Sequence, residues 1–204
     1  MRRVLIAGMT GSGKTTLGRR LAPALGLEYH ELDDLYYGPG MRMATEFPSV
    51  IDQITAGEQW LFDSQGPPVD SEAPLTVRDR LWARADTLVW LDYPRRVVVW
   101  RAVTRSLRRI ITRERLWRDY RDSPLQWFRP DHPIRRAWRL AKVRSKQIEA
   151  RTRAPASTHL TVVRLRNPSE TETWLNGIRV YSQEAALDTG ATGAENSRYD
   201  DPTA

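Results

Sequence analysis

Short apolar runs alternate with longer amphipathic stretches along most of the chain. Five runs with the length and composition of strands cover residues 4–7, 27–32, 59–63, 87–92 and 159–165. Helical spacing of apolar residues predicts helices over residues 14–25, 45–56, 76–85, 94–115, 134–150 and 168–176. Because strands and helices alternate, the pattern predicts an α/β fold in which a mostly parallel sheet has helices on both faces.

The helix over residues 94–115 follows a proline, which favours the first turn of a helix. Its large apolar residues recur every three or four positions and predict one buried face. That face comprises Val99, Val103, Leu107 and Ile110 or Ile111.

The turn after the first expected strand carries a complete P-loop motif, Gly8-x-x-x-x-Gly13-Lys14-Thr15. Its glycines let several backbone N–H groups converge on one anion beside a helix N-terminus. Lys14 is expected to place its charge on the β- and γ-phosphates, and Thr15 to offer its hydroxyl to Mg²⁺. The predicted nucleotide-binding set is Gly8, Gly11, Ser12, Gly13, Lys14, Thr15 and Thr16. The strand before the loop and the helix after it argue against a turn that binds nothing.

Carboxylates follow three of the expected strands, at the edge of the sheet where α/β proteins bind ligands. Asp63 is the expected acidic ligand of Mg²⁺, directly or through water. Asp33 is expected to accept the proton of an attacking hydroxyl or to hold its donor, although aspartate is also common in solvated turns. Asp92 has two interpretations, a functional carboxylate or the cap of the helix that begins near Pro94.

Charge is distributed unevenly along the chain, whose net charge is +7. Residues 95–153 contain 17 Arg and 2 Lys against 5 acids, a net charge of +14, so the remaining residues carry −7. Such a segment attracts nucleotides, nucleic acid or anionic lipid, or forms solvated helix surfaces. Arg101 and Arg105 lie four positions apart on one helix face, from which they could clamp phosphate.

The absence of cysteine excludes disulfides and thiolate metal sites and fits a cytoplasmic location. No apolar run approaches the roughly 20 residues that span a bilayer, and the stretch over residues 4–7 is too short for an export signal. We therefore expect no membrane partner. Residues 1–180 are expected to form one domain, and the polar, acidic residues 181–204 a disordered tail.

Beyond the P-loop, recognisable motifs occur at 31–37, 60–63, 85–96 and 162–168. They read ELDDLYY, WLFD, ADTLVWLDYPRR and VVRLRNP. Their order resembles that of small bacterial adenylate-kinase-like P-loop proteins, often labelled topology modulation proteins, over about residues 1–176. The resemblance implies a three-layer nucleoside-kinase-type fold, with a five-stranded parallel sheet of order 2-3-1-4-5, that uses ATP and Mg²⁺.

The same resemblance implies functional roles outside the P-loop. Arg101 and Arg105 fall where such proteins begin an arginine-rich helical lid, here about residues 101–150, and contact ATP. Asp33 falls where related kinases hold their acceptor. The group usually has Asp-Gly-Asn-Tyr where this chain has Asp63 followed by Ser-Gln-Gly-Pro-Pro, which leaves the acceptor's identity open.

Two functions fit these features. In the first, the protein transfers the γ-phosphate of ATP to a small hydroxyl or nucleotide acceptor, with Lys14, Asp33 and Arg105 as catalytic residues. In the second, it is a nucleotide-dependent regulatory protein or ATPase that contacts nucleic acid through its arginine-rich segment. The segment lacks an evident nucleic-acid motif and matches the kinase lid, which favours the first. The sequence leaves open whether the protein is a monomer or a dimer.

Overall fold

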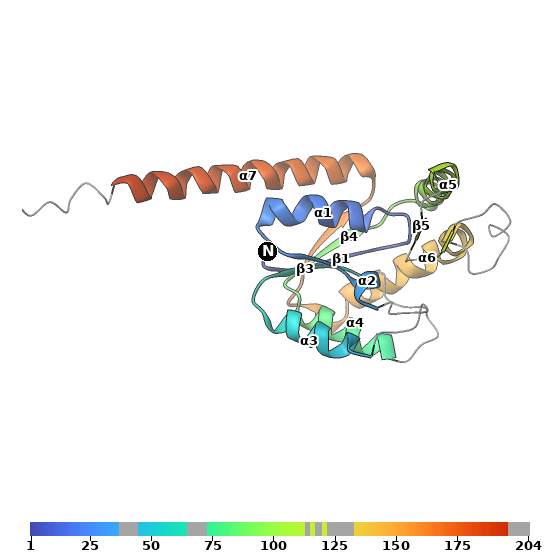
Figure 1. The fold of residues 1–204 in the computed structure, drawn as a ribbon. Coiled ribbons are helices and arrows are strands. Elements are labelled where there is room, and N and C mark those ends of the chain that lie inside the picture. The colour runs from blue at the N-terminus through green and yellow to red at the C-terminus, as the bar shows by residue number, and fades with distance from the viewer. Residues whose placement is uncertain (37–44, 65–72, 113–114, 117–119, 122–132, 196–204) are drawn as a thin grey trace, which may run out of the picture.

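The computed structural model describes residues 1–36, 45–64, 73–112, 115–116, 120–121 and 133–195 (Figure 1). A parallel sheet of five strands runs through the centre, with helices on both faces. Its strands are β1 (Arg3–Gly8), β2 (Tyr29–Glu31), β3 (Trp60–Ser64), β4 (Thr87–Leu91) and β7 (Thr161–Leu165). Their spatial order is β2-β3-β1-β4-β7. This order confirms the predicted arrangement 2-3-1-4-5.

Helices connect the strands and cover the sheet. They are α1 (Lys14–Leu25), α2 (Leu32–Tyr36), α3 (Phe47–Ala56), α4 (Ala73–Arg84), α5 (Arg95–Thr112), α6 (Pro133–Thr152) and α7 (Pro168–Glu195), with a 3₁₀ turn at Pro155–Ser157. Helices α1 and α7 lie on one face of the sheet, and α3 and α4 on the other (Figure 1). Between α5 and α6, β5 (Arg115–Leu116) and β6 (Tyr120–Arg121) pair antiparallel; the rest of the expected lid between the two helices lies outside the described residues.

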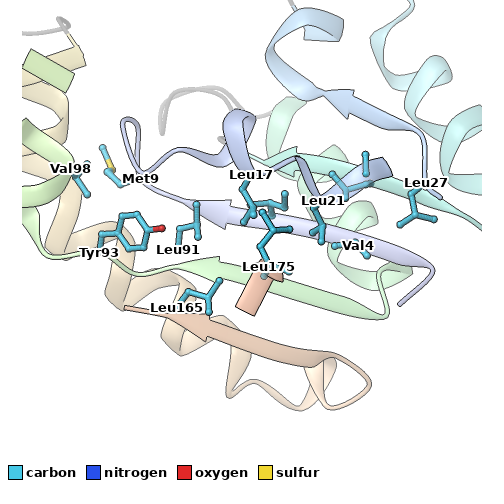
Figure 2. Packing of buried hydrophobic residues seen from close by; sticks show 14 of the residues in the cluster. Val4, Met9, Leu17, Leu21, Leu27, Leu91, Tyr93, Val98, Leu165 and Leu175 are labelled. Carbon is cyan, nitrogen blue, oxygen red and sulfur yellow. The ribbon is translucent and has the colours of Figure 1, made fainter. Parts of the chain in front are cut away.

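The central strands are buried on both faces, which explains why their sequences lack polar alternation. Along β1, Val4 and Ile6 join the core beneath α1 and α7, whereas Leu5 and Ala7 join the core beneath α3 and α4. Figure 2 shows the first of these cores, where Leu175 of α7 meets the α1 residues above β1. The two cores hold the carboxyl ends of the strands at one edge, next to the loop that follows β1.

The buried face of α5 agrees with the predicted one only in part. Leu107 and Ile111 are 48% and 72% exposed. The helix instead buries Val98, Ala102 and Ser106. At these positions α5 packs against the P-loop. A Cβ built at Gly11 would lie 2.8 Å from the Val98 carbonyl oxygen and 3.5 Å from Ala102 Cβ. A backbone can approach a helix this closely only across small side chains. Of the predicted face, Val99 still packs partly buried against the core, whereas Leu107 and Ile111 are exposed.

The segment predicted to be a disordered tail begins inside a helix. Helix α7 continues to Glu195, whereas disorder was expected from residue 181, and residues 196–204 lie outside the described residues. The first turn of α7 is fixed on the sheet, and adding residues to an existing helix costs little. Glu184 and the two alanines after it also favour helix.

Candidate nucleotide-binding site

The P-loop joins the carboxyl end of β1 to the N-terminus of α1. Gly11 and Gly13 adopt φ values of 85° and 95°, a left-handed region that other residues enter only with strain. Ser12 donates its backbone N–H to the Met9 carbonyl at 3.0 Å, which closes the turn. The structure therefore has the backbone conformation that lets N–H groups converge on a phosphate.

Lys14 is almost fully buried where α1 begins. Its Nζ donates to the Met9 carbonyl at 3.2 Å, so the side chain folds back along the loop. Burial lowers the pKa of Lys14 to about 8, against the opposing influence of the Asp63 and Asp33 carboxylates. A buried cation of this kind is stabilised when an anion binds beside it.

A hydroxyl and two carboxylates lie together one residue further on. The Thr15 hydroxyl lies 2.9 Å from Asp63 Oδ2 and 3.3 Å from Glu31 Oε1. Glu31 and Asp63 are direct partners in the register of β2 and β3, which explains why both reach Thr15. Burial and the neighbouring charge of Asp63 raise the pKa of Glu31.

These oxygen donors have the chemistry that Mg²⁺ prefers, particularly when phosphate oxygens and water complete its coordination. Within the described part of the chain, no three or more acidic or histidine side chains gather into a site that could hold a metal alone. Thr15 and Asp63 were predicted for this role and do lie together. The sequence analysis missed Glu31 because it appears there as a polar interruption of a weak strand. Its position two residues before Asp33 was the one sign in the sequence that it could belong to the site.

Tyr29 also contacts this group, and the sequence analysis did not single it out. Its hydroxyl donates to Asp63 Oδ2 at 2.9 Å. Burial, followed by the charge of Asp63, raises the pKa of Tyr29 above its ordinary value, so the hydroxyl keeps its proton.

Asp33 lies in the first turn of α2, immediately after β2. Its negative charge, like that of Asp63, opposes the lowering of the Lys14 pKa. Its place at the mouth of the loop and its role toward an acceptor stay predictions.

Arg101 and Arg105 extend from α5 toward the loop. Arg101 donates from Nη1 to the Ser12 carbonyl at 3.0 Å, and its guanidinium lies 5.3 Å from the centre of the Tyr93 ring. Arg105 adds positive charge near Lys14 and helps to lower its pKa. Both arginines thus line the cleft beside the P-loop, and their contact with a bound phosphate stays a prediction.

A cleft of about 290 Å³ opens beside the P-loop between α1, α5 and α7. It is lined by Gly11, Ser12, Gly13, Thr16, Leu17, Arg20, Tyr93, Arg101, Arg105, Pro168, Thr171 and Glu172. Arg20 and Glu172 form a bidentate ion pair at one wall, and the hydroxyls of Tyr93 and Thr171 bond at 2.6 Å at another. Four predicted phosphate-site glycine and hydroxyl positions and both predicted arginines therefore face one cavity.

Asp92 belongs to a different network. Its Oδ1 accepts from the Ser145 hydroxyl at 2.7 Å, and its Oδ2 accepts from Arg164 at 2.6 and 2.9 Å. Arg164 also reaches Glu149 at 3.4 Å. Of the two interpretations left open, these bonds favour a structural one, although Asp92 ties β4 to α6 and β7 rather than capping α5.

Comparison with known proteins finds similar folds among solved structures but no related sequence family. No protein-family model and no curated protein matches the sequence. Among solved structures, a shikimate kinase from Bacteroides thetaiotaomicron is similar at a TM-score of 0.50 and 14% identity, covering 89% of this chain and 98% of that one. Also similar are a shikimate kinase from Acinetobacter baumannii in complex with shikimate (0.48, 16% identity, 94% and 94% covered) and a gluconokinase from Sinorhizobium meliloti 1021 (0.45, 15%, 92% and 97%).

The chain thus has the fold of small P-loop kinases, with a P-loop, a hydroxyl–carboxylate cluster and two arginines at the expected edge of its sheet. Identities this low define the fold and leave the acceptor undefined. Within the described ranges, none of the helices combines the length and apolar character needed to cross a bilayer.

Proposed function

We propose that this protein is an ATP-dependent phosphotransferase that moves the γ-phosphate to a small hydroxyl or nucleotide acceptor. The observation that carries the proposal is the joint placement of Lys14, the Thr15–Asp63 pair and Arg101 around one loop. A lysine, a magnesium-type donor set and an arginine are the groups that phosphoryl transfer needs around a triphosphate.

In this proposal the phosphates lie on the P-loop and the rest of the nucleotide occupies the adjoining cleft. Lys14 neutralises the β- and γ-phosphates, while Arg101 and Arg105 oppose the charge that develops during transfer. Thr15 and Asp63, with Glu31 beside them, would hold Mg²⁺, which neutralises phosphate oxygens when bound.

Asp33 would act on the acceptor. As the acceptor oxygen bonds to the γ-phosphorus, the bond from phosphorus to the β,γ-bridging oxygen breaks, and the acceptor proton passes to the Asp33 carboxylate. ADP leaves with its electron pair on the former bridging oxygen. The membership of the topology-modulation group and the adenylate-kinase-like lid remain parts of this proposal.

The test is a coupled assay of ATP consumption against nucleoside monophosphates, nucleosides and small polyols, with shikimate added because a similar fold belongs to a shikimate kinase. We expect acceptor-stimulated turnover that Lys14→Ala abolishes and Asp33→Asn lowers in kcat by about 100-fold or more. Lys142→Ala, at an exposed position of α6, is the control that should retain activity. If no acceptor raises turnover above slow basal hydrolysis, the transferase proposal fails.

One observation supports the alternative function in regulation. On α5, Trp100 is 68% exposed and Arg108 also faces solvent, and a basic surface with an aromatic side chain can bind single-stranded nucleic acid. Nucleotide-dependent retention of DNA or RNA that weakens steeply with salt, without acceptor-stimulated turnover, would favour this alternative.

A further inference from the structure

Tyr29 contacts the carboxylate at the centre of the candidate metal site. It lies on β2 two residues before Glu31, and alternate residues of a strand point to the same side. Both side chains therefore reach the region of Thr15 and Asp63. Neither the P-loop motif nor the proposed roles of Lys14 and Asp33 require a tyrosine here.

The Asp63 carboxylate is almost fully buried, and each of its oxygens has a donor. Oδ2 lies 2.9 Å from the Tyr29 hydroxyl and 2.9 Å from the Thr15 hydroxyl, and Oδ1 accepts the Leu32 backbone N–H at 3.2 Å. If Thr15 turns its hydroxyl toward a metal, Tyr29 and the Leu32 N–H remain to fix the carboxylate. Groups that orient a ligand in this way commonly change metal affinity when removed.

The position of the Tyr29 ring depends on a glycine in α1. A Cβ built at Gly18 would lie 2.3 Å from Tyr29 Cε2 and 2.8 Å from Cζ. Glycine within a helix is destabilising relative to alanine. Helix α1 thus carries an unfavourable residue at the one turn where the ring must pass to reach Asp63.

We propose that Tyr29 is a positioning residue for the metal site: its hydroxyl, which reaches Asp63 across Gly18, holds the carboxylate in the orientation that serves the metal of a bound metal–nucleotide complex. This inference rests on the proposed function. It differs from a packing role, in which the ring alone would matter and the hydroxyl would be dispensable.

Tyr29→Phe separates these roles because it keeps the ring and removes the hydroxyl. The probe is Mn²⁺, titrated by electron paramagnetic resonance in the presence of a non-hydrolysable ATP analogue. We expect the variant to bind Mn²⁺ about tenfold more weakly, while its affinity for the analogue in EDTA, measured by calorimetry, stays within about twofold of the wild-type value. Tyr181→Phe, at a residue that is 72% exposed, is the matched control and should titrate like the wild type.

Gly18→Ala tests the same contact from the other side. We expect it to weaken Mn²⁺ binding in the wild-type background and to have little further effect in the Tyr29→Phe background, since the displaced ring then has no hydroxyl to misplace. Thermal unfolding of each variant confirms that it is folded. A Tyr29→Phe titration that superimposes on the wild-type curve overturns the inference, whether or not stability changes.

The same titration separates failure of this inference from failure of the proposed function. If the wild-type protein binds Mn²⁺ with the analogue and Tyr29→Phe weakens that binding, the inference holds even where no acceptor is phosphorylated. If the wild-type protein binds no Mn²⁺ with the analogue, both are overturned.

Discussion

Lys14 links nucleotide binding to pH. Its pKa is lowered to about 8 by burial, so the free protein carries this charge below pH 8 and loses it above. Phosphates bound beside Lys14 favour the protonated form and raise its pKa again. Above pH 8, binding must therefore take up a proton, and we expect the affinity for a non-hydrolysable ATP analogue to fall by up to about tenfold per pH unit.

Calorimetry from about pH 7 to about pH 9.5 in buffers of different ionisation enthalpy checks this linkage through both affinity and proton uptake. Lys14→Met should bind more weakly at pH 7 and lose the dependence, whereas Lys142→Met should keep it because that side chain is exposed. A wild-type affinity that stays constant across the range would contradict the expectation.

Residues of the candidate site were predictable where they belong to a motif of consecutive positions. The P-loop from Gly8 to Thr15 is such a segment, and the structure confirms its backbone conformation. Glu31 and Tyr29 were missed because their importance comes from the register of β2 beside β3. Asp92 could not be assigned because its partner Arg164 lies on another strand, 72 positions away.

At the scale of elements, the contact between the P-loop and α5 gives a sharp prediction. In Gly11→Ala the new Cβ would lie 2.8 Å from the Val98 carbonyl, at a φ of 85°. We expect the loop to move away from α5 and the affinity for the ATP analogue to fall by about 100-fold, since the loop and Arg101 together form the proposed phosphate site.

Gly26→Ala is the matched control for backbone strain. Gly26 ends α1 with a φ of 65°, but nothing lies within 4 Å of a Cβ built there. It should lower the free energy of unfolding by about 1 kcal/mol and leave nucleotide affinity unchanged. Urea unfolding and calorimetry on both variants make the comparison, and equal affinities would show that the close approach of Gly11 is dispensable.

Most element boundaries apart from the end of α7 followed well from the sequence, whereas faces and packing did not. The predicted bounds of α1 match the structure, because Gly26 marks its end and leucines mark its buried face. The bounds of α5 were nearly right, but its buried face was only partly right, because Val99 packs against the core while Leu107 and Ile111 are exposed. Hydrophobic periodicity assumes that the largest apolar side chains are buried. This assumption fails where a helix packs against the backbone of a glycine-containing loop, as α5 does at Ala102 beside Gly11.

For the whole molecule, alternation of strands and helices was enough to predict the layers. The strand order came from the resemblance, since no local pattern states which strands are neighbours. The domain boundary at residue 180 stays a prediction, although the segment that composition suggested as a tail from residue 181 is helical to Glu195. Composition reports how much apolar surface a segment can bury, and a helix already fixed at one end can continue without burying more.

Helix α7 therefore has a part that stabilises the fold and a part that does not. Leu175 is fully buried against α1 and the sheet (Figure 2), whereas Val180 and Tyr181 are 54% and 72% exposed. We expect Leu175→Ala to lower the free energy of unfolding by about 2–5 kcal/mol through the cavity that it leaves. Removal of residues 185–204 should change that free energy by less than about 0.5 kcal/mol, since the described contacts of α7 with the core come before them.

Urea unfolding of the full chain, Leu175→Ala and the truncated chain measures both effects, with Val180→Ala as a control at an exposed position of the same helix. Nucleotide affinity of the truncated chain should match that of the full chain, because Thr171 and Glu172, which line the cleft, lie in the first turns of α7. If the truncated chain unfolds at a clearly lower urea concentration than the full chain, residues 185–204 contact the domain. Helix α7 would then stabilise the fold along its whole length.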